Sequence, residues 1–101
     1  MRYGNDNGSY QIVDLPGCSQ VAVSIHSFIF KNRRGMGLGR EAHQMRLREI
    51  AKLGYDYVVC TVRDGNIPEI KILQKFGWCL LDTFVSSSTD HRIRLYGKKL
   101  R

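Results

Sequence analysis

The sequence predicts an α/β fold, an α+β sandwich in which two helices cover one mixed β-sheet. Stretches rich in β-branched and aromatic residues alternate with stretches of helical periodicity, a pattern typical of strands joined by helical crossovers. With 101 residues the chain has room for one core, so we assign residues 1–101 to a single domain. A hydrophobic fraction of 43% and only two prolines indicate a globular chain rather than a disordered one.

The predicted order of elements is (β)-β-α-β-α-β-β. A short strand at residues 10–14 comes first, and residues 20–30 (QVAVSIHSFIF) then form a long strand in the middle of the sheet. A helix follows at 38–53 and ends at Gly54, which suits a C-terminal cap. The apolar stripe of this helix consists of Leu38, Ala42, Met45, Ile50 and Leu53. Arg46 interrupts the stripe, so the amphipathic pattern is imperfect.

The second half of the chain supplies the remaining elements. Residues 55–63 (YDYVVCTVR) form a second buried strand, and a short helix is expected at 67–76 after an Asp-Gly-Asn break. Strands at 78–85 and 91–100 complete the sheet. The first helix therefore connects two buried strands that we expect to be parallel, in a right-handed βαβ unit.

The most informative segment is residues 31–40 (KNRRGMGLGR), which joins the long strand to the first helix. Four polar residues, three of them basic, lead into three alternate glycines, which are Gly35, Gly37 and Gly39. Glycines bring backbone N–H groups close to a ligand, a helix start attracts phosphate, and arginines add bidentate contacts. The βαβ unit places this loop at the carboxyl edge of the strands, where α/β folds bind ligands. We therefore expect a binding site for a phosphorylated cofactor.

Three glycine motifs compete for this segment. The P-loop pattern G-x-x-x-x-G-K-[ST] is absent. Residues 37–42 satisfy the dinucleotide pattern G-x-G-x-x-[GA], although polar residues separate the loop from the strand. Arg34, Gly37 and Gly39 satisfy R-x-x-G-x-G. A glycine-rich turn with solvated arginines is the alternative that needs no ligand.

The third motif resembles motif A of the GNAT acetyltransferase superfamily, in which the loop holds the pyrophosphate of acetyl-CoA. A second segment is similar to the family pattern N-x-x-A-x-x-x-Y-x-x-x-G-F, with Asn66, Gly77 and Trp78 matching in register. Together the two motifs cover about Val21 to Leu100. The resemblance implies a GNAT-like mixed sheet in a short single-domain form that lacks the usual N-terminal strand and helices. Such short forms resemble members carried by phages and mobile elements.

The resemblance implies an enzyme, an acyltransferase that moves an acetyl group from the co-substrate acetyl-CoA to a primary amine, with a protein as the expected acceptor. Backbone groups at the end of the long strand would pair with the pantetheine arm, and the glycine loop with its arginines would hold the pyrophosphate. Asn66 would hydrogen-bond the pantetheine, or else cap the following helix. The implied cofactor-binding residues are Ser27, Phe28, Ile29, Arg33, Arg34, Gly35, Met36, Gly37, Leu38, Gly39 and Asn66.

The resemblance leaves the general base unassigned. His26 is the catalytic candidate, although strand alternation puts it on the face opposite Val23 and Ile25, where the family often carries its base. Leu73 stands where the family often has a tyrosine acid. Because a thiolate leaves readily, this loss weakens catalysis without excluding it. Further candidates for proton transfer, each with packing as its alternative role, are Tyr57, Cys60, Thr61 and Tyr96.

Composition bounds the location and the partners. Cys18, Cys60 and Cys79 are odd in number and lack metal-site spacing, so we expect reduced thiols, a cytoplasmic protein and no metal. No apolar run approaches the ~20 residues that cross a bilayer, so no membrane partner is expected. The net charge of +7 favours anionic partners, and exposed sheet edges favour a homodimer. Two alternatives stay open: a catalytically degenerate CoA-binding or interaction protein, and a basic nucleic-acid-binding domain that uses the tail at 92–101.

Overall fold

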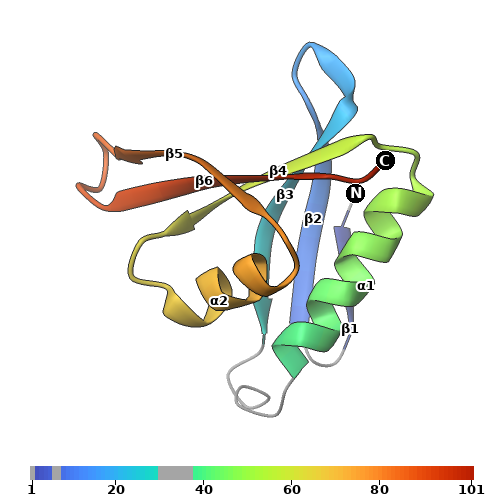
Figure 1. Cartoon of the computed structure of the whole chain (residues 1–101), viewed down its shortest axis with the longest axis horizontal. Coiled ribbons are helices and arrows are strands. Elements are labelled where there is room, and N and C mark those ends of the chain that lie inside the picture. Colours follow the sequence, from blue (N-terminus) through green and yellow to red (C-terminus); the bar gives the residue numbers. More distant parts are fainter. Residues whose placement is uncertain (1, 6–7, 30–37) are drawn as a thin grey trace.

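The computed structural model describes residues 2–5, 8–29 and 38–101, and Figure 1 shows the arrangement of their elements. The elements in chain order are β1 (Arg2–Asn5), β2 (Gly8–Leu15), β3 (Cys18–Ile29), α1 (Leu38–Lys52), β4 (Tyr57–Arg63), α2 (Ile67–Lys75), β5 (Cys79–Val85) and β6 (Arg92–Lys99). Neither described helix is both long enough and apolar enough to span a membrane.

The strands form one mixed sheet in the order β1-β2-β3-β4-β6-β5. Only β3 and β4 pair in parallel among the described strands, and the other neighbours are antiparallel. This confirms the predicted fold class and the central position of the strands predicted at 20–30 and 55–63. The strand β1 was not predicted, because its sequence RYGN shows no alternation of apolar residues. It pairs along the outer edge of β2, with Arg2 opposite Gln11.

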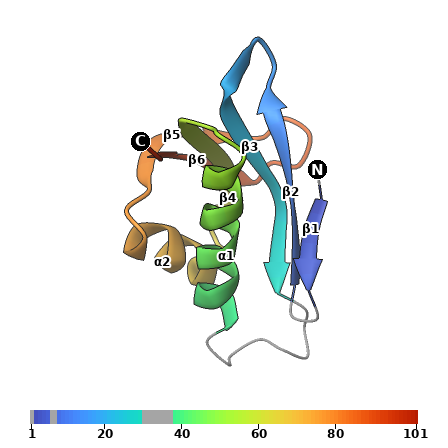
Figure 2. The same ribbon diagram turned by 90° about the vertical axis from the view of Figure 1, so that its right-hand side faces the viewer.

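Both helices lie on the same side of the sheet (Figure 2). The alternate β4 residues Val58, Cys60 and Val62 are buried in the core. The buried hydrophobic core consists of Ile12, Ala22, Ile50, Val58, Cys60, Val62, Ile70, Leu73, Trp78 and Tyr96. On the opposite face of the sheet, no helix of the described residues covers the strands.

The buried side of α1 differs from the predicted stripe. The helix ends at Lys52, and Leu53, which we expected in the stripe, is 39% exposed. His43 and Arg46 are buried beside Ile50 instead. The predicted stripe is right at the buried Ile50 and wrong at Leu53. His43 and Arg46 are buried because α1 contacts α2 as well as the sheet, and the interior between the helices supplies partners for polar side chains.

Tyr57 packs across Gly97 of the antiparallel neighbour β6. A Cβ atom on Gly97 would lie 2.8 Å from Cε1 of Tyr57 and 2.9 Å from Cδ1 of Leu81. The absence of a side chain at Gly97 therefore lets the Tyr57 ring and Leu81 approach the sheet closely.

Replacing Gly97 with alanine should lower the free energy of unfolding by about 1–3 kcal/mol, because the new methyl group overlaps Tyr57 and Leu81. Gly65→Ala is the matched control, since no atom lies within 4 Å of its Cβ position, and it should change stability by less than about 0.5 kcal/mol. Chemical denaturation measures both variants. Equal stability of Gly97→Ala and the wild type would contradict the close packing.

Candidate functional site

The parallel strands β3 and β4 are paired along only a short part of their length. Val21–Val23 of β3 pair with Tyr57–Val59 of β4, and no further β3–β4 pairing occurs in the part of the chain that the structure describes. Beyond this ladder the two strands separate toward their carboxyl ends (Figure 1). We call the region between residues 24–29 of β3 and 60–63 of β4 the β3–β4 separation. Its backbone groups need partners, and an extended amide-containing ligand offers them.

A β-bulge in β3 lies beside this separation. From Ile25 to Phe28 the strand β3 advances by three residues, while its partners in β2, Gln11 and Ser9, are two residues apart. The bulge therefore accommodates one extra residue of β3, within the pair 26–27. Bulges bend a strand and increase its twist, and they are common beside binding sites. The bulge thus gives a physical reason why the end of β3 turns away from β4.

Both helices begin next to the carboxyl ends of these two strands. The helix α1 starts at Leu38, following β3 in the chain, and α2 starts at Ile67, following β4. A helix start carries unpaired N–H groups and the positive end of the helix dipole, both of which favour anionic groups. The β3–β4 separation is therefore flanked by two helix starts, of which that of α1 suits a phosphorylated ligand better, because α2 has Pro68 and Glu69 in its first turn and the N–H of Ile67 is bonded to Gly65.

The predicted cofactor-binding residues fall into two groups in the structure. Ser27, Phe28 and Ile29 form the backbone of β3 at the separation, and Leu38 and Gly39 form the first turn of α1. The predicted residues that lie outside the described part of the chain are Arg33, Arg34, Gly35, Met36 and Gly37.

The catalytic candidate His26 lies at the bulge in β3. Strand alternation, on which the sequence analysis placed its side chain, does not continue through a bulge. The side chain of His26 is not among those that the structure describes, so its face stays undetermined. His26 remains a prediction.

Asn66 stands immediately before α2 and is exposed. Its side chain makes no capping hydrogen bond, although its backbone carbonyl accepts one from the N–H of Ile70. Two roles were predicted for Asn66, and the structure does not show one of them, the capping of α2 by its side chain. The side-chain amide can take a ligand instead.

The other candidates for proton transfer have structural roles. Burial raises the pKa of the Cys60 thiol to about 12, so this group stays protonated at neutral pH. The hydroxyl of Tyr96, a buried residue, accepts a hydrogen bond from Nη1 of Arg94 at 3.2 Å. This hydrogen bond raises the pKa of Arg94. A second one, from Nε of Arg94 to Asp64 at 2.5 Å, has a smaller effect in the same direction. Leu73 is fully buried in the core.

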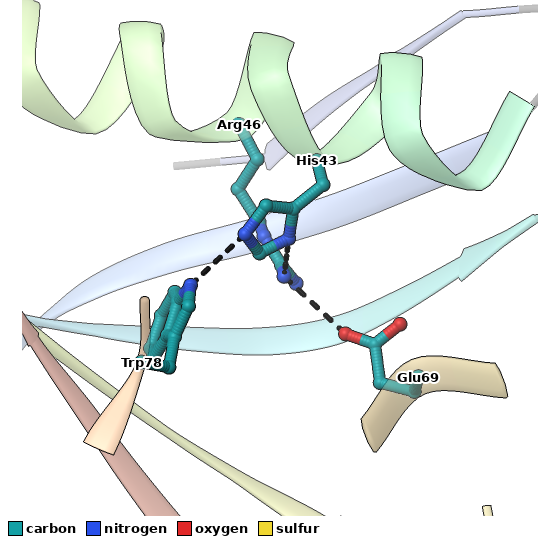
Figure 3. Close-up of polar contacts among 4 residues, drawn as sticks. All are labelled: His43, Arg46, Glu69 and Trp78. Carbon is teal, nitrogen blue, oxygen red and sulfur yellow. Dashed lines mark hydrogen bonds and ion pairs between the residues drawn. The ribbon is translucent and has the colours of Figure 1, made fainter. Parts of the chain in front are cut away.

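The structure also holds a group of buried polar contacts that the sequence analysis missed. This polar cluster consists of His43, Arg46, Glu69 and Trp78 (Figure 3). Nη2 of Arg46 lies 3.3 Å from Oε1 of Glu69 and 2.5 Å from Nδ1 of His43. Nε1 of Trp78 donates to Nε2 of His43 at 2.9 Å, and the guanidinium lies 5.8 Å from the Trp78 ring centroid.

The polar cluster requires a neutral His43. Both ring nitrogens of His43 face donors, one from Arg46 and one from Trp78, and a protonated ring can accept from neither. Burial, followed by the charges of Arg46 and Lys98, lowers the pKa of His43 to about 3. A neutral imidazole accepts at one nitrogen only, so the polar cluster has more donors than acceptors. Glu69 supplies the negative charge of the polar cluster.

The arrangement of strands and helices described above has counterparts among solved structures. No protein-family model and no curated protein sequence matches the chain. Solved structures do match. One is a protein from Salmonella typhimurium assigned as an acetyltransferase and solved with acetyl-CoA, with a TM-score of 0.82 at 16% identity over 94% of this chain and 58% of that chain.

Two further structures have the same architecture. A GNAT-family acetyltransferase from Bacillus anthracis matches with a TM-score of 0.78 at 14% identity, over 93% of this chain and 58% of that one. The ribosomal-protein-S18-alanine N-acetyltransferase from Escherichia coli matches with a TM-score of 0.78 at 13% identity, over 99% of this chain and 68% of that one. The chain thus has the fold of GNAT acetyltransferases, and it spans about three fifths of the length of the first two structures.

The low pKa of His43 predicts how stability depends on pH. The unfolded chain takes up a proton near pH 6.5 and the folded chain only near pH 3, so stability falls by about 1.4 kcal/mol per pH unit as the pH drops between these values. His43→Gln, which cannot titrate, should flatten this slope in denaturation curves recorded from pH 7 to pH 4. The exposed His91→Gln is the control and should keep the wild-type slope. An unchanged slope in His43→Gln would contradict a buried neutral His43.

Proposed function

We propose that this chain is a GNAT-type N-acetyltransferase, which binds acetyl-CoA in the β3–β4 separation and transfers the acetyl group to a primary amine on a protein. The observation that supports it most is the parallel β3–β4 ladder that stops after Val21–Val23, so that the carboxyl ends of β3 and β4 are not paired with each other among the described residues. A closed sheet would leave no unpaired strand backbone to bind an extended ligand at this point. In the sequence, the motif R-x-x-G-x-G follows β3, and Asn66 of the second motif follows β4.

The proposed contacts follow the chemistry of the ligand. Backbone groups of Ser27, Phe28 and Ile29 pair with the pantetheine amides, and one N–H there polarises the thioester carbonyl. The amides of residues 35–39 bind the pyrophosphate at the start of α1, and Arg33 and Arg34 supply positive charge. The exposed amide of Asn66 hydrogen-bonds the pantetheine.

Acetyl-CoA supplies an activated thioester, and the chain has to deliver a neutral amine to it. A lysine-type ammonium has a pKa of ~10.4, so it must lose a proton before its nitrogen attacks the carbonyl. We propose His26 as the group that takes this proton. The C–N bond then forms and the C–S bond breaks, and the thiol of CoA, with a pKa of ~8.5 by analogy with cysteine, leaves as a thiolate. Leu73 at the usual acid position is compatible with this step.

We propose a protein as the acceptor because the sheet face opposite the helices is uncovered among the described residues. An open face admits a side chain or a chain terminus. We also propose a homodimer, because dimerisation covers exposed apolar surface. On the edge strand β5 this surface consists of Leu80, Leu81, Phe84 and Val85. Because all three cysteines are free thiols, we place the protein in the reducing cytoplasm.

Nucleic-acid binding is less well supported. Two cations of the basic C-terminal segment are already paired with carboxylates, Arg94 with Asp64 and Arg101 with Asp56. These ion pairs reduce the charge that is available for a phosphate backbone. A catalytically degenerate CoA-binding protein remains the nearest alternative, and it differs from the enzyme only in turnover.

Calorimetric titration with acetyl-CoA tests the proposed function. We expect saturable binding that weakens for dephospho-CoA and is absent for NAD. Gly37→Glu should abolish binding, because its carboxylate repels the pyrophosphate. Ala51→Glu adds the same charge to an exposed position near the other end of α1 and should leave the affinity unchanged. Binding that persists in a folded Gly37→Glu protein would refute the assignment of the loop.

Asn66→Ala separates ligand binding from helix capping. Because the side chain caps nothing, its removal should cost less than about 0.5 kcal/mol, below the ~1 kcal/mol typical of a lost cap. The affinity for acetyl-CoA should fall at least threefold, about the loss of one hydrogen bond. Thermal denaturation and calorimetry on the same sample measure both quantities. A large loss of stability with unchanged affinity would reverse the assignment.

A further inference from the structure

The polar cluster connects two halves of the molecule that the sheet itself joins weakly. One half contains β1, β2, β3 and α1, and the other contains β4, β5, β6 and α2. Between them, the described sheet has only the ladder of Val21–Val23 with Tyr57–Val59. His43 and Arg46 belong to α1, whereas Glu69 belongs to α2 and Trp78 stands just before β5. The contacts in Figure 3 therefore cross from one half to the other.

The ion pair of the polar cluster joins the start of α2 to the middle of α1. Glu69 is in the first turn of α2, the end that carries Asn66. Arg46 lies in the middle of α1, about two turns after Leu38 and Gly39. The 3.3 Å contact between Arg46 and Glu69 therefore fixes the start of α2, beside the proposed ligand contact Asn66, against the body of α1. The tilted rings of His43 and Phe76, with centroids 4.7 Å apart, hold the far end of α2 in the same way.

Stability alone does not account for this arrangement. Arg46 is 2% exposed, and its Nε has no hydrogen-bond partner among the described residues. Burying a guanidinium requires desolvation that a single, partly exposed carboxylate offsets poorly, and an apolar side chain of similar size often packs with equal or better stability. The guanidinium does what an apolar side chain cannot, because its Nη2 contacts both Glu69 and His43.

We propose that Arg46 is a positioning residue, which through Glu69 and His43 sets the distance between the two halves of the sheet and thereby shapes the β3–β4 separation for acetyl-CoA. This inference rests on the proposed function, since it concerns the affinity of the same site. The guanidinium itself lies in the interior and takes no part in the transfer.

The test compares variants that lose the cross-link with one that only loses stability. Arg46→Met keeps an unbranched apolar side chain without the guanidinium, Glu69→Gln keeps the shape without the charge, and Ile50→Ala removes a fully buried core contact of the same helix outside the polar cluster. Acetyl-CoA affinity is measured by calorimetry at a temperature where near-ultraviolet circular dichroism and the fluorescence of Trp78 show every variant to be folded. The free energy of unfolding is measured in parallel.

We expect Arg46→Met to weaken acetyl-CoA binding at least tenfold and Glu69→Gln at least threefold. Ile50→Ala should leave the affinity within twofold while losing at least as much stability. Arg46→Lys, which keeps the charge but places a compact ammonium on a shorter side chain, should bind with an affinity between those of Arg46→Met and the wild type. An affinity of Arg46→Met within twofold of the wild type, or losses that merely follow stability in all variants, would overturn the inference.

Hydrogen exchange tests the positioning role without any ligand. Arg46→Met should speed amide exchange at residues 21–23 and 57–59 at least tenfold more than along the β5–β6 ladder, because the junction of the two halves loosens first. Equal acceleration in both ladders would overturn the role of Arg46. If the wild type fails to bind acetyl-CoA, the proposed function fails, and this exchange experiment still decides whether Arg46 holds the halves together.

Discussion

The parallel pairing of β3 with β4 ends after three residues on each strand, and the arrangement of the candidate site depends on that early end. The bulge at residues 26–27 turns β3 away, which leaves strand backbone without a neighbour inside an otherwise continuous sheet. Both helix starts then lie beside the separated ends, because each helix follows one of these two strands in the chain. Unpaired strand backbone and the start of α1 together suit a ligand with an amide-containing arm and a phosphorylated end.

Because the β3–β4 ladder is short, the two halves of the sheet share few hydrogen bonds, and the helices supply further contacts between them. A three-residue ladder leaves the two halves of the sheet poorly joined, and α1 and α2 add contacts on the covered side. Some of those contacts are apolar, through Ile50, Ile70 and Leu73, and others belong to the polar cluster, in which His43 is neutral and Glu69 lies beside Arg46. A buried cation with one carboxylate is sensitive to geometry, since any widening leaves both charges without compensation. The distance between β3 and β4 at the site is therefore linked to the buried contacts between α1 and α2.

Much of the fold could be predicted from the sequence, because the segments at 20–30 and 55–63 are rich in β-branched residues and the intervening helix ends at a glycine. The bulge was not predicted, although the consecutive polar residues His26 and Ser27 interrupt the alternation at its position, because the pairing partner that reveals the extra residue is seen only in the structure. The burial of Arg46 was missed for a related reason. A charged residue in a helical pattern indicates solvent until a partner such as Glu69, distant in sequence, is known to face it. For Asn66, helix capping and ligand binding favour the same residue type, so only the structure separates them.

The central claim is that acetyl-CoA lies between β3 and β4, and hydrogen exchange with and without the ligand tests it directly. Amides that pair with the pantetheine arm lose contact with solvent, whereas amides elsewhere are unaffected by a ligand at this position. Our account predicts slower exchange at residues 24–29 and 60–63 when acetyl-CoA is saturating, with little change along β5 and β6. Protection confined to β5 and β6, or no protection at the β3–β4 separation despite saturable binding, would contradict it.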